Sequence, residues 1–115
     1  MNNRFKFRVW KGQENRMVYE VTYLNPLILD PSIKEENKHN ILMQCTGLKD
    51  KNGKLIYEGD IVQWGKTNFA VVWQSCQYAL KKDINEKPID FSLTSFNGKE
   101  IEAIGNIYEN PEALN

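Results

Sequence analysis

The chain lacks the residues that mark a metal site, a secreted protein or a membrane protein. Its single histidine, His39, and its two cysteines, Cys45 and Cys76, do not have the close spacing of zinc ligands or of a CxxC redox pair. The longest apolar run, Phe69–Trp73, is far shorter than the ~20 residues of a membrane span, and the start has no signal-peptide core. We therefore expect no metal, no cofactor, no membrane contact and two free thiols in a reducing cytoplasm.

Net charge is also absent, since 15 lysines and arginines balance 15 aspartates and glutamates. No overall field therefore attracts nucleic acid or an anionic membrane. The distribution is uneven, because Arg4, Lys6 and Arg8 make the start basic, whereas the segment Glu100–Glu112 has four glutamates and no basic residue. We expect the two ends to lie close together or to meet across a subunit contact, and the alternative is a basic binding surface.

What the chain does contain is typical of one folded domain covering residues 1–115. Hydrophobic residues make up 41% and aromatic residues 11%, values that argue against disorder. Short runs of β-forming residues separated by turn signals predict an all-β fold with at most one short helix, arranged as a small barrel or pseudobarrel of antiparallel hairpins. Strands are predicted at 4–9, 17–23, 41–45, 61–64, 69–74, 78–80, 89–93 and 101–104, with a surface excursion at 24–40.

The first predicted strand alternates strictly between apolar and basic residues. Phe5, Phe7 and Val9 occupy one face and the basic residues occupy the other, which predicts a half-buried strand with a solvated basic face. Trp10 falls on that basic face. After the strand, residues 11–15 predict a turn into the strand that begins at Met17, so the two strands should pair as a hairpin.

The most informative stretch runs from Thr46 to Trp64. Asn52 and Gly53 both tolerate positive φ, and this pair is a strong signal for a hairpin turn. A second reversal is predicted at residues 57–60, where Tyr57 and Glu58 precede Gly59 and Asp60; Gly59 supplies backbone freedom and Asp60 can accept nearby backbone N–H groups. Later turns are predicted at 65–68 and 97–98, Gly105–Asn106 should interrupt the last strand, and the chain should end in a short tail after Asn110–Pro111.

Three segments resemble the signature segments of the YopX family: TGLKDKNGKLIYEGDIVQW, the opening RFKFRVW followed by MVYEV, and the ending IGNIYENPEAL. The resemblance implies a compact, mostly β protein encoded by a phage or bacterial prophage, and thus a place in the cytoplasm of the bacterial host. It implies no set of catalytic residues.

Two constellations nevertheless have the residue types of an active site. Glu58 and Asp60 are a pair of carboxylates beside a motif, and Cys45 with His39 is a nucleophile and base if the fold brings them together. In each case a structural explanation is preferred: Asp60 orders a turn, Cys45 packs in an apolar strand, and His39 is solvated in a charged loop. We expect no enzymatic activity, with an uncharacterised enzyme kept as the third hypothesis.

The first functional hypothesis is a binding or assembly module that acts through a protein partner or through homo-oligomers. The alternative is a nucleic-acid-binding barrel, because residues 55–74 are similar to the strand-turn-strand core of SH3-like barrels. For either partner the candidate binding residues are basic or aromatic, and they comprise Arg4, Lys6, Arg8, Trp10 and Trp64. The structural turn residues are Asn52, Gly53, Tyr57, Gly59 and Asp60.

Overall fold

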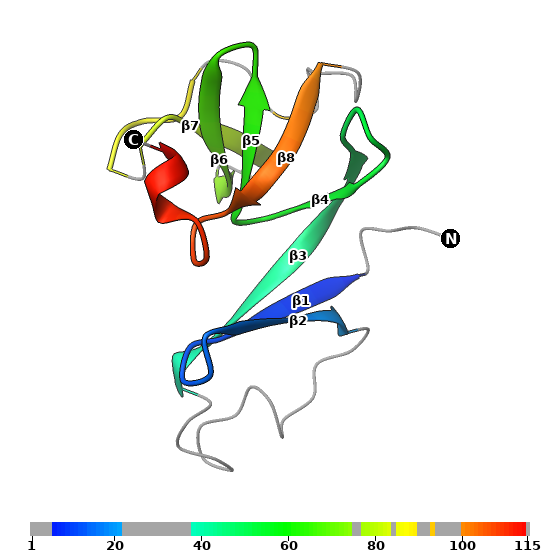
Figure 1. Ribbon diagram of the computed structural model, residues 1–115, viewed down its shortest axis with the longest axis vertical. Helices are drawn as coiled ribbons and strands as arrows, with labels where there is room; N and C mark the ends of the chain where they lie inside the picture. The colour runs from blue at the N-terminus through cyan, green and yellow to red at the C-terminus, as the bar shows by residue number, and fades with distance from the viewer. Residues whose placement is uncertain are drawn as a thin grey trace.

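The computed structural model describes residues 6–21, 38–74, 77–83, 85–89, 93 and 100–114, without the side chains of residues 20 and 21. In these ranges the chain forms mostly strands, with a short 3₁₀ helix near its end (Figure 1). The strands make two four-stranded antiparallel sheets, in the orders β2-β1-β3-β4 and β7-β6-β5-β8, which confirms the all-β prediction. The elements are β1 (Phe7–Lys11), β2 (Arg16–Val21), β3 (Asn40–Lys49), β4 (Leu55–Tyr57), β5 (Asp60–Trp64), β6 (Thr67–Gln74), β7 (Gln77–Lys81), β8 (Ile101–Asn106) and η4 (Pro111–Leu114).

The first sheet is built on the predicted β1–β2 hairpin and on β3. In the β1–β3 register Arg8 lies opposite Met43 and Trp10 lies opposite Ile41, so these four side chains share one face. The prediction that Arg8 lies on a solvated face is wrong, since Arg8, Val9 and Trp10 are all buried. The reason is that the shared face is covered by residues of the second sheet and of the chain after β8, so β1 is not a half-buried strand.

The stretch from Thr46 to Trp64 carries the chain from one sheet to the other. The predicted hairpin turn is confirmed, since the chain reverses at Asn52–Gly53 between the paired strands β3 and β4. At the second predicted reversal the chain does turn, at Glu58–Gly59, but it passes from β4 of the first sheet into β5 of the second instead of folding back on β4. Gly53 and Gly59 have φ of 80° and 87°, values that glycine adopts without strain. The Gly59 N–H donates to the carbonyl of Val71 (2.8 Å), which fixes this crossover against β6.

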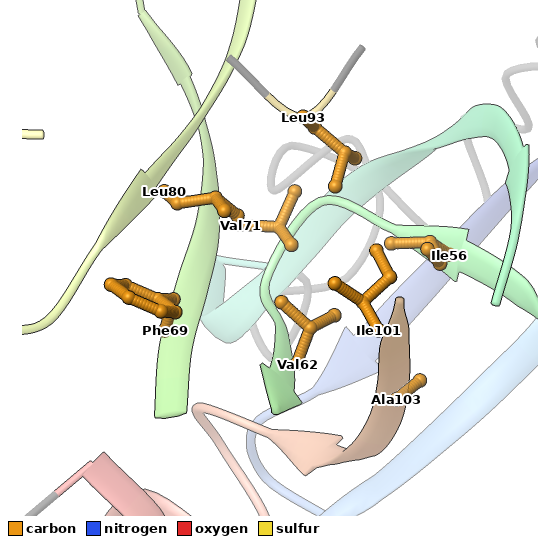
Figure 2. Close-up of a cluster of buried hydrophobic side chains, with 8 residues drawn as sticks. All are labelled: Ile56, Val62, Phe69, Val71, Leu80, Leu93, Ile101 and Ala103. Atoms are coloured by element: carbon orange, nitrogen blue, oxygen red, sulfur yellow. The ribbon is translucent and has the colours of Figure 1, made fainter. Parts of the chain in front are cut away.

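The second sheet surrounds the main hydrophobic core, to which β4, β5, β6, β7 and β8 all contribute. Figure 2 shows the buried side chains of this core: Ile56, Val62, Phe69, Val71, Leu80, Leu93, Ile101 and Ala103. Two details differ from the sequence prediction. Trp64 pairs with Thr67, so the β5–β6 turn is tighter than predicted, and β8 continues through Gly105 instead of stopping there.

The end of the chain is a short helix and not a tail. Helix η4 lies beside β6, where Asn68 Nδ2 donates to the carbonyl of Ala113 at 2.7 Å (Figure 1). Other sequence predictions lie outside the described residues, namely most of the excursion at 24–40 and the turn at 97–98. Of the predicted strand 89–93, only Ile89 and Leu93 are described, and neither belongs to a strand.

Candidate functional site

A buried ion pair joins the two sheets. Arg8 Nη1 on β1 lies 2.8 Å from Asp60 Oδ1 on β5, and the two side chains are 2% and 5% exposed. The second amino group of Arg8 donates to the carbonyl of Glu58 at 3.0 Å. Asp60 Oδ2 accepts the backbone N–H of Tyr57 at 2.8 Å, so the pair also holds the crossover between β4 and β5 in place.

Two tyrosine rings flank the guanidinium. Arg8 Cζ lies 4.8 Å from the ring centroid of Tyr57 and 5.8 Å from that of Tyr19. The two rings meet edge to face, with centroids 5.8 Å apart. Both contacts favour the charged guanidinium, because the negative face of an aromatic ring attracts a cation.

A cleft of about 380 Å³ opens beside this cluster. Its lining consists of Arg8, Tyr19, Lys54, Leu55, Tyr57 and Asp60, so aromatic and aliphatic walls surround a few charged groups. Ligand sites in proteins usually have roughly this composition and a volume of about 300–1,000 Å³. The geometry therefore suits the binding of one or two side chains or a small molecule.

The charged side chains at the cleft differ in whether they form a direct ion pair. Burial raises the pKa of Asp60, because the loss of water outweighs the attraction of Arg8 and the hydrogen bond from the Tyr57 amide. Ionised Asp60 offsets the charge of Arg8. Lys54, in contrast, is exposed at the rim and forms no ion pair with any residue that the structure describes.

Asp50 fixes the position of Lys54. Its Oδ1 accepts the backbone N–H groups of Asn52 and Lys54, both at 2.9 Å, and its Oδ2 accepts that of Ala103 on β8 at 2.8 Å. Burial alone would raise the pKa of the Asp50 carboxyl, but these three donors outweigh it and lower the pKa below its usual value. The rim of the cleft is thus tied to both sheets.

Gly59 lies behind the ion pair, and the space there is filled. A Cβ added to it would lie 2.8 Å from Met43 Sδ and 3.6 Å from Arg8 Nη2. A larger residue is therefore disfavoured at this position by its positive φ, and Met43 would also have to shift to admit it.

The five predicted binding residues do not form one exposed surface. Arg8 is held in the ion pair, and Trp10 is buried and stacks on Tyr108 with ring centroids 5.6 Å apart. Trp64 is 38% exposed and lies at the end of β5 in the second sheet, against Phe69. Lys6 is partly exposed, and Arg4 lies outside the described residues. Arg8 and Trp10 are thus not exposed as the prediction required, because the second sheet and Tyr108 cover them, although Arg8 does line the cleft described above.

The charged ends of the chain do not pair as expected within the described residues. The ion pairs of Lys11 and Arg16 are with Glu14, at 2.6 and 3.3 Å, and Glu102 pairs with Lys51 at 3.2 Å. The two ends do lie close together, but the contact is the Trp10–Tyr108 stack.

The proposed Cys45–His39 pair does not form. His39 is exposed just before β3, and Cys45 is fully buried six residues further on, which is about 20 Å along an extended strand. Burial raises the pKa of the Cys45 thiol, so the thiolate is disfavoured. Within the described ranges there is no cluster of three or more His, Cys, Asp or Glu side chains that would hold a metal ion.

Sequence reasoning missed Tyr19, Lys54 and Leu55 of the cleft and the role of Asp50. One signal was available: Trp10 is in phase with Arg8 on β1, and a large apolar residue on the arginine face indicates that this face is buried. An aspartate two residues before Asn52 is also typical of a side chain that accepts backbone N–H groups across a turn.

The fold and the cleft define a small all-β protein with two antiparallel sheets joined by a buried ion pair. The model of the YopX protein family matches residues 6–115, so the chain belongs to the YopX family. No helix in the described part of the chain is long and apolar enough to cross a membrane.

Solved structures with a similar fold include two bacterial proteins. Protein EF1440 from Enterococcus faecalis is 24% identical, with a TM-score of 0.70 over 96% of this chain and 97% of that one. Protein yopX from Bacillus subtilis is 23% identical, with a TM-score of 0.63 over 100% of both chains. A comparison with curated proteins gives no match.

Proposed function

We propose that the protein is a non-catalytic binding module that holds a segment of a partner protein in the cleft beside the Arg8–Asp60 pair. The observation that carries the proposal is the cleft itself, in which exposed Tyr19 and Lys54 surround a floor of buried and mutually bonded side chains. A rigid floor with accessible aromatic and charged groups at its rim is the usual form of a recognition pocket.

The resemblance to phage and prophage proteins supports a place for this binding in the cytoplasm of a bacterial host. The partner is then a host protein, a phage protein or a second copy of this chain. We favour a protein partner over nucleic acid because two of the residues expected to contact nucleic acid, Arg8 and Trp10, are buried. The charged groups that remain at the cleft do not form a basic track.

The test is a selection from a displayed peptide library with the wild-type chain as bait, followed by calorimetry on the selected peptides. We expect Tyr19→Ser and Lys54→Glu to weaken binding at least about tenfold, because a recognition pocket concentrates its binding energy in a few central residues. Both side chains are exposed, so neither substitution should unfold the chain.

Lys66→Glu is the matched control, since Lys66 is an exposed lysine in the β5–β6 turn of the other sheet. Selected peptides whose affinity is the same for the wild type, Tyr19→Ser and Lys54→Glu would overturn the proposal. Light scattering of the free chain at low and high salt then tests whether a second copy is the partner, since a strict monomer excludes it.

A further inference from the structure

One cationic side chain at the cleft, Lys54, makes no direct ion pair with a described residue. Asp60 compensates Arg8, whereas the ammonium group of Lys54 has no ion-pair partner among the described residues. Asp50 is bonded to the backbone N–H of Lys54 and not to its side chain. Asp50 and Asp60 attract the Lys54 charge only over a longer distance, so a ligand carboxylate that reaches the exposed ammonium can form the direct ion pair that no described carboxylate forms.

Beside this charge lies an apolar surface. Tyr19 is 50% exposed, Leu55 is half-buried, and both line the same cleft as Lys54. The Tyr19 ring packs edge to face against Tyr57 on one side. The exposed half of the Tyr19 side chain can contact a ligand. An aromatic or large aliphatic group that covers Tyr19 and Leu55 removes apolar surface from water.

These two features together define the chemistry of the ligand. We infer that the cleft recognises a protein segment in which a single carboxylate side chain is adjacent to an aromatic or large aliphatic side chain. The carboxylate pairs with Lys54, and the apolar side chain packs on Tyr19 and Leu55. This inference rests on the function proposed above, for which it names the sequence that is bound.

The observations favour a single carboxylate over a polyanion. A strand of nucleic acid needs several cations along a track, and among the residues that line the cleft Lys54 is the one exposed cation without a direct ion pair. The buried ion pair is an unsuitable second anchor for a phosphate chain, because Asp60 would repel it.

The inference is tested by titrating the full-length ¹⁵N-labelled chain with short model ligands and following the amide signals of Lys54, Leu55 and Tyr57. The probes are acetyl-Phe-Glu-amide, acetyl-Phe-Gln-amide and acetyl-Ala-Glu-amide, together with 3-phenylpropionate and a thymidine oligonucleotide. We expect the Phe-Glu probe to bind about two- to fivefold more tightly than the Phe-Gln probe, the effect of one exposed ion pair. The Ala-Glu probe should bind more weakly than Phe-Glu, because it lacks the apolar contact.

Two variants assign the effect to a residue. In Lys54→Gln the preference for Phe-Glu over Phe-Gln should disappear, while in Lys66→Gln, the matched exposed lysine, it should persist. Equal affinities of the Glu and Gln probes in the wild type would overturn the inference. Selected peptides that bind through the cleft but contain no acidic residue would overturn it too, and would leave the proposed function standing.

The other two probes distinguish other ligands. If 3-phenylpropionate bound as tightly as Phe-Glu, the cleft would be a site for small carboxylates and not for a protein segment. If the oligonucleotide bound most tightly and its affinity fell steeply with salt, the ligand would be a nucleic acid. If no probe and no selected peptide shifted these amides, both the inference and the proposed function would be wrong.

Discussion

The substitution Arg8→Met tests how the buried ion pair holds the two sheets together. Methionine has a similar length and no charge, so the variant leaves the Asp60 carboxylate buried without its cation. It also removes the bond to the Glu58 carbonyl and the contacts with both tyrosine rings. Breaking one side of a buried pair usually costs about 3–5 kcal/mol, and we expect a loss in that range for the free energy of unfolding.

The reverse change, Asp60→Asn, should cost less. Its amide oxygen can still accept the Tyr57 N–H, and Arg8 keeps the Glu58 carbonyl and the two tyrosine faces as partners. The raised pKa of Asp60 points the same way, because it means that the folded state tolerates a neutral group here at least as well as the carboxylate. We therefore expect Asp60→Asn to rescue most of the stability that Arg8→Met loses when the two are combined.

The same reasoning predicts a pH dependence of defined sign. A carboxyl whose pKa is higher in the folded state binds more protons there, so its contribution to stability falls as pH rises from its unfolded pKa to its folded pKa. Without Arg8 the pKa of Asp60 should rise further. The stability gap between Arg8→Met and the double variant should therefore be widest at neutral pH and close on acidification.

Urea unfolding followed by tryptophan fluorescence measures all four species at several pH values. Arg16→Met on β2 is the matched control: Arg16 is exposed and pairs only weakly with Glu14, so its loss should cost less than about 1 kcal/mol. At each pH the difference in the free energy of unfolding between the single and the double variant is taken. The titration of the other carboxyl groups contributes equally to both variants and cancels in this difference. A double variant as unstable as Arg8→Met, at every pH, would refute the account of the pair.

Three further predictions concern stability and reactivity. In urea unfolding, Gly59→Ala should lower the free energy of unfolding by at least about 1 kcal/mol more than Gly53→Ala does. Both glycines have positive φ, but only the new methyl group at Gly59 meets a neighbour, Met43 Sδ. Equal losses would contradict the packing argument. Asp50→Asn should lower the free energy of unfolding by about 2 kcal/mol at neutral pH. This loss should shrink as the pH falls through the lowered pKa of Asp50 in the folded state, because the wild type then loses the same stabilisation. A loss that did not change with pH would contradict this prediction. In the variant Cys76→Ser, Cys45 of the folded protein should react with a thiol reagent much more slowly than Cys45 of the protein unfolded in urea. The reason is that the folded state buries the thiol and raises its pKa. Equal rates in the two states would contradict the burial of Cys45.

The turns of this fold could be predicted from the sequence because their chemistry is local. Gly53 and Gly59 adopt a positive φ that glycine tolerates, a requirement that can be recognised from a few neighbouring residues, and the structure has a turn at each. The hairpin of β1 and β2 is equally local. The burial of Arg8 was predicted wrongly: Trp10 on the same face indicated that this face is covered, but alternation along one strand does not show which residues cover it.

The cleft could not be predicted for the same physical reason. Tyr19, Arg8 and Lys54 come from three different strands or turns, and they meet only through the pairings β2–β1, β1–β3 and β3–β4. None of these residues belongs to a short motif with the others. The sequence indicated the right crossover, at Thr46 to Trp64, but with a structural role only.

The structure gives that crossover both roles. It supplies four of the six residues that line the cleft, Lys54, Leu55, Tyr57 and Asp60, and it also joins the two sheets. Substitutions at Tyr57 or Asp60 would therefore change the fold and the cleft together, and a loss of binding there would not show what the cleft contacts. Lys54 is the exposed residue of these four, and its side chain forms no ion pair with a described residue, so at this position the function of the crossover can be separated from its structural role.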